Sequence, residues 1–309
     1  MPYLSMIEYY NYNPKKGLYV KVPEYIKGCW MNVVNPSGDE IFFLEKEFDL
    51  CRENIKDGID IHENPRFEIE DKKTYIYLTA PTSKIMHEHD SSFLVIYAKD
   101  QFIVISKEPI EILDNIFNPK FSSKKVSSSR NLVRILRLLS SMFESSVHKV
   151  LKDAKRDRAS IKKLKNRDMI RLINDEEKLN AYISSFAGNI STYSRIFRDK
   201  NLTFLKDEKE TIEDLIIDMN ESMTVCEQTS KTISNMRSYY STKLSNDINE
   251  TIRLLTIVTI FISIPTFITS FYGMNIVLPF QTHPHLLLYL GTLIVFVSAI
   301  LFWFLRKKI

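Results

Sequence analysis

The chain has 309 residues, of which 26% are charged, with 42 Lys or Arg against 38 Asp or Glu. Its three cysteines, Cys29, Cys51 and Cys226, form no CxxC pair. This pattern argues against a disulfide framework and a zinc finger, and it favours a reducing compartment. About 250 residues precede a charge-free C-terminal segment, enough for one α/β domain and a helical region.

The first part of the chain, 1–117, is predicted to form an α/β domain. Runs of β-branched and aromatic residues at Tyr75–Thr79 and Phe93–Tyr97 are typical of strands. A third run, Phe102–Ile105, follows the polar segment Lys99–Gln101. We therefore expect a turn at this segment with a strand on each side of it.

The character of the sequence changes after Pro119. From there a single glycine, Gly188, occurs before position 273, and no proline occurs before position 265. Apolar residues recur at helical spacing over the same region. A helical region over 118–207 and one long helix over 208–272 are therefore predicted.

The predicted helix over 208–272 is longer than a normal globular helix. At about 1.5 Å per residue it approaches roughly 100 Å. Its first half carries an apolar stripe with steps of three, four or seven residues, made of Ile212, Ile216, Met219, Met223, Cys226 and Ile233. Such a helix needs partner helices to bury its stripe, and self-association is the simplest way to supply them.

The 52 residues over 254–305 contain no Lys, Arg, Asp or Glu. They split into two apolar stretches, 254–272 and 286–305, separated by a loop over 273–285 that is rich in proline and polar residues. At about 1.5 Å per residue, each stretch is long enough for a hydrocarbon core of roughly 30 Å. Two transmembrane helices that form a hairpin are therefore predicted.

Basic residues set the expected orientation of this hairpin. Arg253 precedes the first span, the tail over 306–309 contains Arg306, Lys307 and Lys308, and the loop between the spans contains no Lys or Arg. Because basic residues stay on the cytoplasmic side, both termini are expected in the cytoplasm. The chain is predicted to be an integral protein of the cell membrane.

A stripe of hydroxyl side chains runs along the first predicted span. Its members are spaced three, four, three and four residues apart and share one helical face; they are Thr256, Thr259, Ser263, Thr266 and Ser270. The same spacing continues inward to Ile252 and Asn249. Such hydroxyls often bond to their own helix backbone and help helices to pack. In a helix that must also self-associate, however, five hydroxyls on one face favour a water-filled pore.

The segment Tyr272-Gly273-Met274-Asn275, at the end of the first span, resembles the signature of the CorA family of magnesium transporters. The segment Pro265–Phe267 and Asn249 also resemble that family, as do Trp30–Asn32 and the stretch 57–68. The similarity extends over nearly the whole chain, although only the Gly-Met-Asn motif is highly specific.

This resemblance implies a homopentamer with a cytoplasmic α/β funnel, a long stalk helix that continues into the pore, and outer membrane helices. It implies uptake of Mg2+, often with Co2+ or Ni2+, driven by the membrane potential and without enzymatic activity. Gly273, Met274 and Asn275 would form the selectivity filter, with Asn275 holding the hydrated ion. The pore-lining positions would be Asn249, Ile252, Leu255, Thr256, Thr259, Ser263, Thr266 and Ser270, of which Ile252 and Leu255 are apolar enough to gate by dewetting.

The resemblance also implies closure by intracellular Mg2+ bound between subunits. The two carboxylates of that regulatory site would be Asp57 of one subunit and Asp214 of its neighbour. A second acidic position of the family's site is Lys56 in this chain, which favours one regulatory ion per interface.

Two departures from the pattern of the CorA family keep other functions open. The loop over 276–285 has no acidic residue but contains His283 and His285, which keeps a zinc transporter of the same fold as an alternative. A membrane-anchored sensor or scaffold without transport is the alternative from another class. The segment 120–171 has 16 Lys or Arg against four Asp or Glu, which could meet anionic lipid headgroups, whereas no nucleic-acid recognition motif accompanies it.

Overall fold

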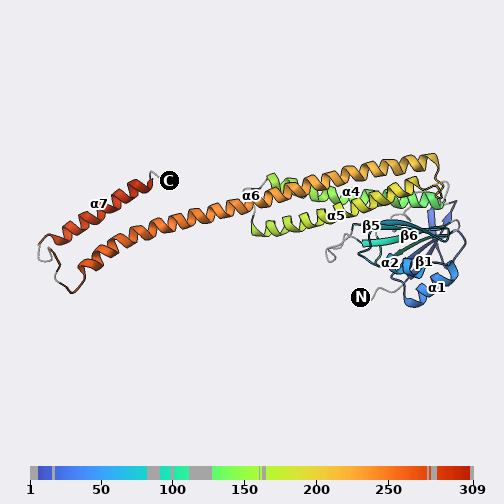
Figure 1. Cartoon of the computed structure of the whole chain (residues 1–309), viewed down its shortest axis with the longest axis horizontal. Helices are drawn as coiled ribbons and strands as arrows, with labels where there is room; N and C mark the ends of the chain where they lie inside the picture. The colour runs from blue at the N-terminus through green and yellow to red at the C-terminus, as the bar shows by residue number, and fades with distance from the viewer. Residues whose placement is uncertain are drawn as a thin grey trace. The chain divides into compact units, whose positions relative to one another are not determined.

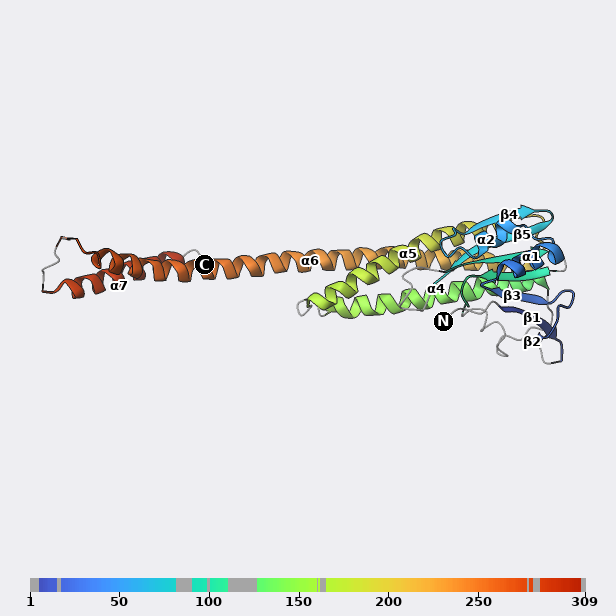
Figure 2. The same cartoon turned by 90° about the horizontal axis from the view of Figure 1, so that it is seen from below.

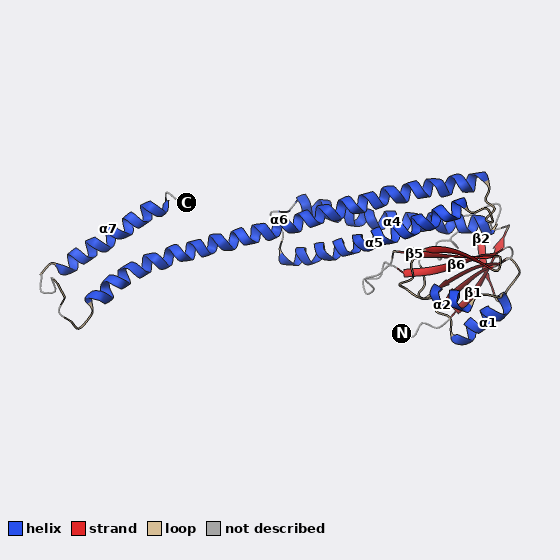
Figure 3. Cartoon of the chain, in the orientation of Figure 1, coloured by secondary structure: helices blue, strands red, loops and turns tan. Residues whose placement is uncertain are grey.

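The computed structural model describes residues 6–15, 18–81, 91–98, 101–110, 127–159, 161, 165–276, 278–279 and 284–306. The chain divides into two compact units, Met1–Arg237 and Ser238–Ile309. Figure 3 shows that the strands belong to the first unit, whereas the described secondary structure of the second unit is helical.

A seven-stranded mixed sheet forms the centre of the first unit, in the order β2-β1-β3-β7-β6-β5-β4. The strands are β1 (Met6–Asn13), β2 (Leu18–Val22), β3 (Trp30–Val34), β4 (Arg66–Glu70), β5 (Lys73–Ala80), β6 (Ser91–Ala98) and β7 (Gln101–Ser106). Strands β3 and β7 are parallel, and the other neighbours are antiparallel. The three strands predicted from β-branched and aromatic runs are confirmed as β5, β6 and β7, whereas residues 99–100 of the expected turn lie outside the described part.

Helices cover both faces of this sheet, as Figure 1 shows for α1 and α2 on one face and the longer helices on the other. Successive side chains of a strand point to opposite faces, so Ile76 and Leu78 belong to one apolar cluster while Tyr75 and Tyr77 belong to the other. Every residue of β5 is buried for this reason. Figure 2 shows the strands from another side, with β2 and β4 at the two edges.

The short helices are α1 (Gly38–Phe48), which a capping box stabilises at its start, and α2 (Arg52–Gly58), which packs closely against the sheet. The Ser37 hydroxyl accepts a hydrogen bond from the Glu40 amide while the Glu40 carboxylate accepts one from the Ser37 amide, a capping box. Gly58 allows α2 to approach the sheet, because a Cβ atom there would lie 2.7 Å from Cβ of Leu94. This close approach sets the position of Asp57 above the strands.

Three long helices lie on the other face: α4 (Ser128–Ala159), α5 (Asn166–Arg198) and α6 (Lys206–Tyr272). The predicted continuous helix over 208–272 is confirmed by α6. Its apolar stripe is also confirmed, because Ile212, Met219, Cys226 and Ile233 are buried and Ile216 and Met223 pack against them. These contacts join the first part of α6 to α4, α5 and the sheet.

The second unit contains the rest of α6 and helix α7 (Leu286–Arg306). By length and composition, α6 is the one helix among the described residues that is long and apolar enough to cross a membrane. Helix α7 is 21 residues long, and among its described side chains the apolar stretch covers Leu286–Ile300, which is shorter. Residues 307–309 of the predicted basic tail and residues 277 and 280–283 of the predicted loop lie outside the described part.

Candidate ion pathway and cation site

The second half of α6 has no buried residue after Met236. Large apolar side chains there are exposed to an extent that is unusual for a soluble helix, for example 55% for Ile252 and 63% for Leu255. Isolated apolar side chains on a surface are common, but a continuous apolar helix surface marks contact with another protein or with lipid. This part of α6 therefore exposes an apolar surface of the kind that another protein or lipid covers.

Two faces of this segment differ in their environment. The hydroxyl stripe, defined as Thr256, Thr259, Ser263, Thr266 and Ser270, is exposed at every position. The partly covered positions are Ile257, Phe261, Ile264, Pro265, Ile268 and Tyr272. At about 100° per residue, these covered positions fall on the face opposite the stripe. The stripe, together with exposed Asn249, Ile252 and Leu255, is thus the face left open.

Within one chain, four of the five hydroxyls of the stripe donate to their own helix backbone. Thr256, Thr259, Ser263 and Thr266 each donate to the carbonyl oxygen four residues earlier, at 2.7–2.8 Å. Their hydrogens therefore point along the helix, but each hydroxyl oxygen still has acceptor capacity. Such oxygens can accept hydrogen bonds from water without breaking the helical contacts.

Helix α6 ends at the Gly-Met-Asn motif. The Gly273 amide donates to the Thr269 carbonyl oxygen at 2.9 Å, and the Met274 amide donates to the Phe271 carbonyl oxygen at 3.4 Å. A Cβ atom at Gly273 would lie 3.2 Å from the Thr269 oxygen, so the lack of a side chain relieves crowding where the helix stops. Asn275 follows as an exposed residue.

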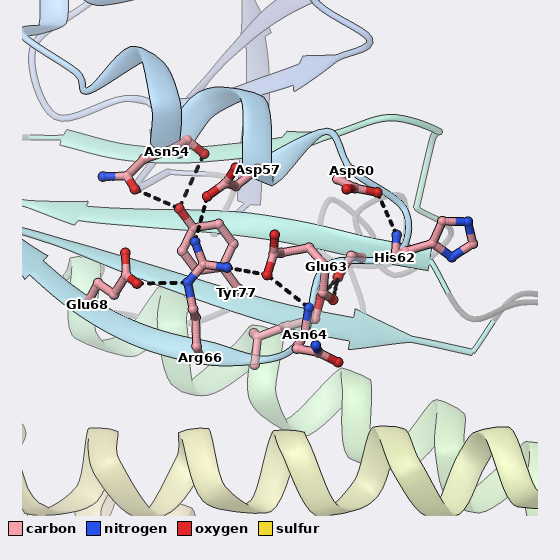
Figure 4. A network of polar contacts seen from close by, with 11 residues as sticks. Asn54, Asp57, Asp60, His62, Glu63, Asn64, Arg66, Glu68 and Tyr77 are labelled. Atoms are coloured by element: carbon pink, nitrogen blue, oxygen red, sulfur yellow. Dashed lines mark hydrogen bonds and ion pairs between the residues drawn. The ribbon is translucent and has the colours of Figure 1, made fainter.

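In the first unit, Asp57 lies in a cluster centred on Arg66, which Figure 4 shows. Nη2 of Arg66 is 2.7 Å from Oδ2 of Asp57, and its Nε is 2.8 Å from Oε1 of Glu68. Nη1 of Arg66 pairs with Glu63. One guanidinium therefore binds three carboxylates, which come from α2, the turn after it and β4.

The aromatic ring of Tyr77 forms the floor of this cluster. The guanidinium carbon of Arg66 lies 3.8 Å from the centre of the ring, a cation–π contact. The Tyr77 hydroxyl is 3.0 Å from Oδ1 of Asn54, and burial raises the pKa of this hydroxyl. Partial burial alone lowers the pKa of Arg66, but its hydrogen bonds to Asp57, Glu68 and Glu63 raise that pKa overall. Arg66 is therefore a fixed positive charge.

Asp214 lies in a different part of the unit, on the first half of α6. It lines a cavity of about 310 Å3 between α4 and α6, together with Arg137, Ser140, Ser141, Glu144, Thr211, Leu215, Asp218, Met219 and Ser222. The helix α2 that carries Asp57 and the helix α6 that carries Asp214 cover opposite faces of the sheet. The fold of one chain therefore does not bring these two aspartates together.

The sequence did not indicate the role of Arg66. The stretch 57–68 carries the family resemblance, but charges in a polar turn are usually solvated. The available signal in the sequence is the set of opposite charges at Glu63, Arg66 and Glu68. The contact of Arg66 with Tyr77 depends on the pairing of β4 with β5, in which these two residues lie opposite each other.

The fold and the exposed apolar part of α6 together define a class of protein: an α/β protein with a long helix that is apolar enough to cross a membrane. Comparisons with known proteins then specify the family, because residues 27–307 match the CorA-like Mg2+ transporter protein family. The cobalt/magnesium transport protein CorA of Methanocaldococcus jannaschii is 22% identical over 290 residues, which cover 90% of each chain. The magnesium transport protein CorA of Wolinella succinogenes is 24% identical over 272 residues, covering 80% of this chain and 79% of the relative.

A solved structure described as the complete structure of the CorA magnesium transporter from Methanocaldococcus jannaschii has the same fold. It matches with a TM-score of 0.84 at 17% sequence identity and covers 99% of both chains. The chain belongs to the CorA family of Mg2+ transporters, and it is a CorA-like divalent cation transporter.

Proposed function

We propose that this chain assembles as a homopentamer and carries Mg2+ into the cell through a central pore lined by α6. The observation that carries the proposal is the uncovered hydroxyl stripe opposite the partly covered face of α6, ending at Gly273-Met274-Asn275 in a chain of this family. The stripe faces the pore axis, and α7 forms the second span. Ions of similar size, Co2+ and Ni2+, are accepted as well.

The chemistry of Mg2+ suits such a pore. Mg2+ loses its water reluctantly and usually keeps several water molecules. A ring of Asn275 carboxamide oxygens and Gly273 carbonyl oxygens binds these waters instead of stripping them. Because this ring is neutral, it holds the divalent ion loosely enough to release it.

The membrane potential supplies the driving force. Two charges that cross about 100 mV gain about 4.6 kcal/mol on moving inward. Further inside, the hydroxyl stripe offers polar oxygens to the hydrated ion, while Ile252 and Leu255 form an apolar constriction near the inner end. Such a constriction closes when water leaves it.

The decisive experiment measures ion entry into proteoliposomes under an imposed inside-negative potential. Mg2+ entry that depends on the potential supports the proposal, and Co2+ and Ni2+ are tested beside it. Zn2+ movement coupled to a proton gradient, without Mg2+ entry, would support the zinc transporter. No movement of any divalent cation by an intact oligomer would support a membrane-anchored sensor or scaffold.

Cysteine substitution tests the assignment of the pore face. In a background with Cys51 replaced by serine, since Cys29 and Cys226 are buried, single cysteines at Thr259, Ser263 and Thr266 are expected to react with a water-soluble thiol reagent. The reaction should reduce Mg2+ entry at least about tenfold, because an added group blocks a narrow pore. Labelling and flux are measured on the same vesicles.

Cysteines at Phe261 and Ile268 serve as matched controls on the partly covered face of the same helix. They should stay largely unlabelled, because protein or lipid covers them. Equal labelling at all five sites would show that the pore face is assigned wrongly.

We also propose that closure depends on one Mg2+ ion held between Asp57 of one subunit and Asp214 of the next. Two carboxylates brought close together repel each other, and a divalent cation turns this repulsion into attraction. Because the ion binds the closed arrangement better than the open one, abundant internal Mg2+ favours closure. The family membership and the exposure of Asp214 at a cavity support this site.

A further inference from the structure

Asp57 already has a cationic partner within its own chain. Its Oδ2 atom lies 2.7 Å from Nη2 of Arg66, and the Asp57 side chain is still 43% exposed. Arginine stays protonated at every accessible pH, so this partner cannot be removed by titration. Any external cation that binds Asp57 must share the carboxylate with a permanent positive charge or displace it.

The geometry allows displacement without loss of Arg66 from the cluster. If Asp57 turns away, the guanidinium keeps its contacts with Glu63 and with Glu68, the latter at 2.8 Å. It also keeps its place over the Tyr77 ring. Release of Asp57 therefore breaks one hydrogen-bonded ion pair but leaves Arg66 with two partners.

The charge of the cluster suits a divalent competitor. Three carboxylates against one guanidinium leave a formal charge of −2 on Asp57, Glu63, Glu68 and Arg66, which a single Mg2+ neutralises. The net negative charge of the cluster attracts Mg2+, while the positive charge of Arg66 opposes the approach of the ion to Asp57. The balance between the two sets the concentration at which the ion binds.

We propose that Arg66 is an internal competitor of Mg2+ for Asp57 and thereby raises the Mg2+ concentration at which the channel closes. This inference rests on the regulatory site proposed above. In the open state Arg66 holds Asp57; in the closed state Mg2+ binds Asp57, and Arg66 remains on Glu63, Glu68 and Tyr77.

The test uses the full chain in liposomes with MgCl2 as the only added cation. The midpoint of Mg2+-dependent protection of α6 from a protease is measured, which does not require ion flux. Arg66→Gln is expected to lower this midpoint by up to about fivefold, the upper end of the effect of removing one partly exposed ion pair. An unchanged midpoint in a folded Arg66→Gln protein would overturn the proposal.

A second pair of variants tests whether Arg66 competes with Mg2+ for Asp57, even if Arg66→Gln fails to fold. Glu68→Gln removes a partner of Arg66, which should then hold Asp57 more tightly and raise the midpoint. Glu70→Gln removes the same charge from the same strand, but Glu70 bonds to Asn54 at 2.7 Å. A larger shift for Glu68→Gln supports competition through Arg66, and equal shifts would refute it.

Failure of this inference can be told apart from failure of the regulatory site. Loss of Mg2+-dependent protection in Asp57→Asn with Asp214→Asn, combined with an unchanged midpoint in Arg66→Gln, overturns the role of Arg66 alone. Normal protection in the double variant overturns the regulatory site and, with it, the competition.

Discussion

Replacing Asn275 with alanine is expected to reduce Mg2+ entry to the level of empty vesicles. Asn275 is exposed three residues after the end of α6, where a ring of carboxamides from several subunits would meet the hydrated ion. Alanine offers no side-chain oxygen to the water shell that Mg2+ keeps, so the hydrated ion would lose the hydrogen bonds that hold it at the pore mouth. Mg2+ entry is measured in proteoliposomes under an inside-negative potential, and the oligomer is checked by cross-linking.

Asn220→Ala provides a matched control within α6, the helix that precedes Asn275. Asn220 lies in the first unit, where its amide donates to the Ile216 carbonyl oxygen at 2.7 Å, so its loss should leave Mg2+ entry unchanged. Normal Mg2+ entry through Asn275→Ala would remove Asn275 from the selectivity filter. Loss of the oligomer in Asn275→Ala would instead assign the residue to assembly.

The strands that the sequence predicted are those whose two faces are both covered. Strands β5, β6 and β7 lie inside the sheet, so nearly every side chain is apolar or buried and the runs are continuous. Strand β4 was not predicted, because it is an edge strand with three exposed residues and carries charges at Arg66, Glu68 and Glu70. Its pairing with β5 is a tertiary effect that no local pattern indicates.

Helix α6 was predictable for a different reason. The near-absence of glycine and proline, with an apolar stripe of regular spacing, favours one continuous helix. The same periodicity identified the hydroxyl stripe as one face, and the burial pattern distinguishes it from the opposite face. In the proposed pore the stripe faces other subunits, and a local sequence pattern carries no information on how subunits pack.

The Arg66 cluster could not be predicted because its contacts depend on the fold. Asp57 and Arg66 are nine residues apart and belong to a helix and a strand. Their meeting requires Gly58, which lets α2 approach Leu94, and Tyr77, which lies under the guanidinium. The sequence places the positive charge of Lys56 next to Asp57, whereas the structure adds Arg66 in direct contact with Asp57.

Asp57→Asn combined with Asp214→Asn is expected to keep the channel conductive at Mg2+ concentrations that close the parent. Without the two carboxylates, Mg2+ no longer binds the closed arrangement better than the open one, so it cannot shift the population. The Mg2+ concentration for half-closure should rise at least about tenfold, which corresponds to about 1.4 kcal/mol of lost differential binding. Flux is recorded as internal Mg2+ is varied, together with protection of α6 from proteolysis.

Asp39→Asn combined with Asp207→Asn removes the same charge from the first turns of α1 and α6 and should close like the parent. This control matters because losing two negative charges weakens the attraction of Mg2+ to the whole protein. If the ion binds at Asp57 and Asp214, the Mg2+ concentration for half-closure should shift in the Asp57/Asp214 double variant and not in the Asp39/Asp207 double variant. If both variants close over the parental Mg2+ range, the regulatory ion binds elsewhere, and the Arg66 cluster serves only to hold α2 against β4.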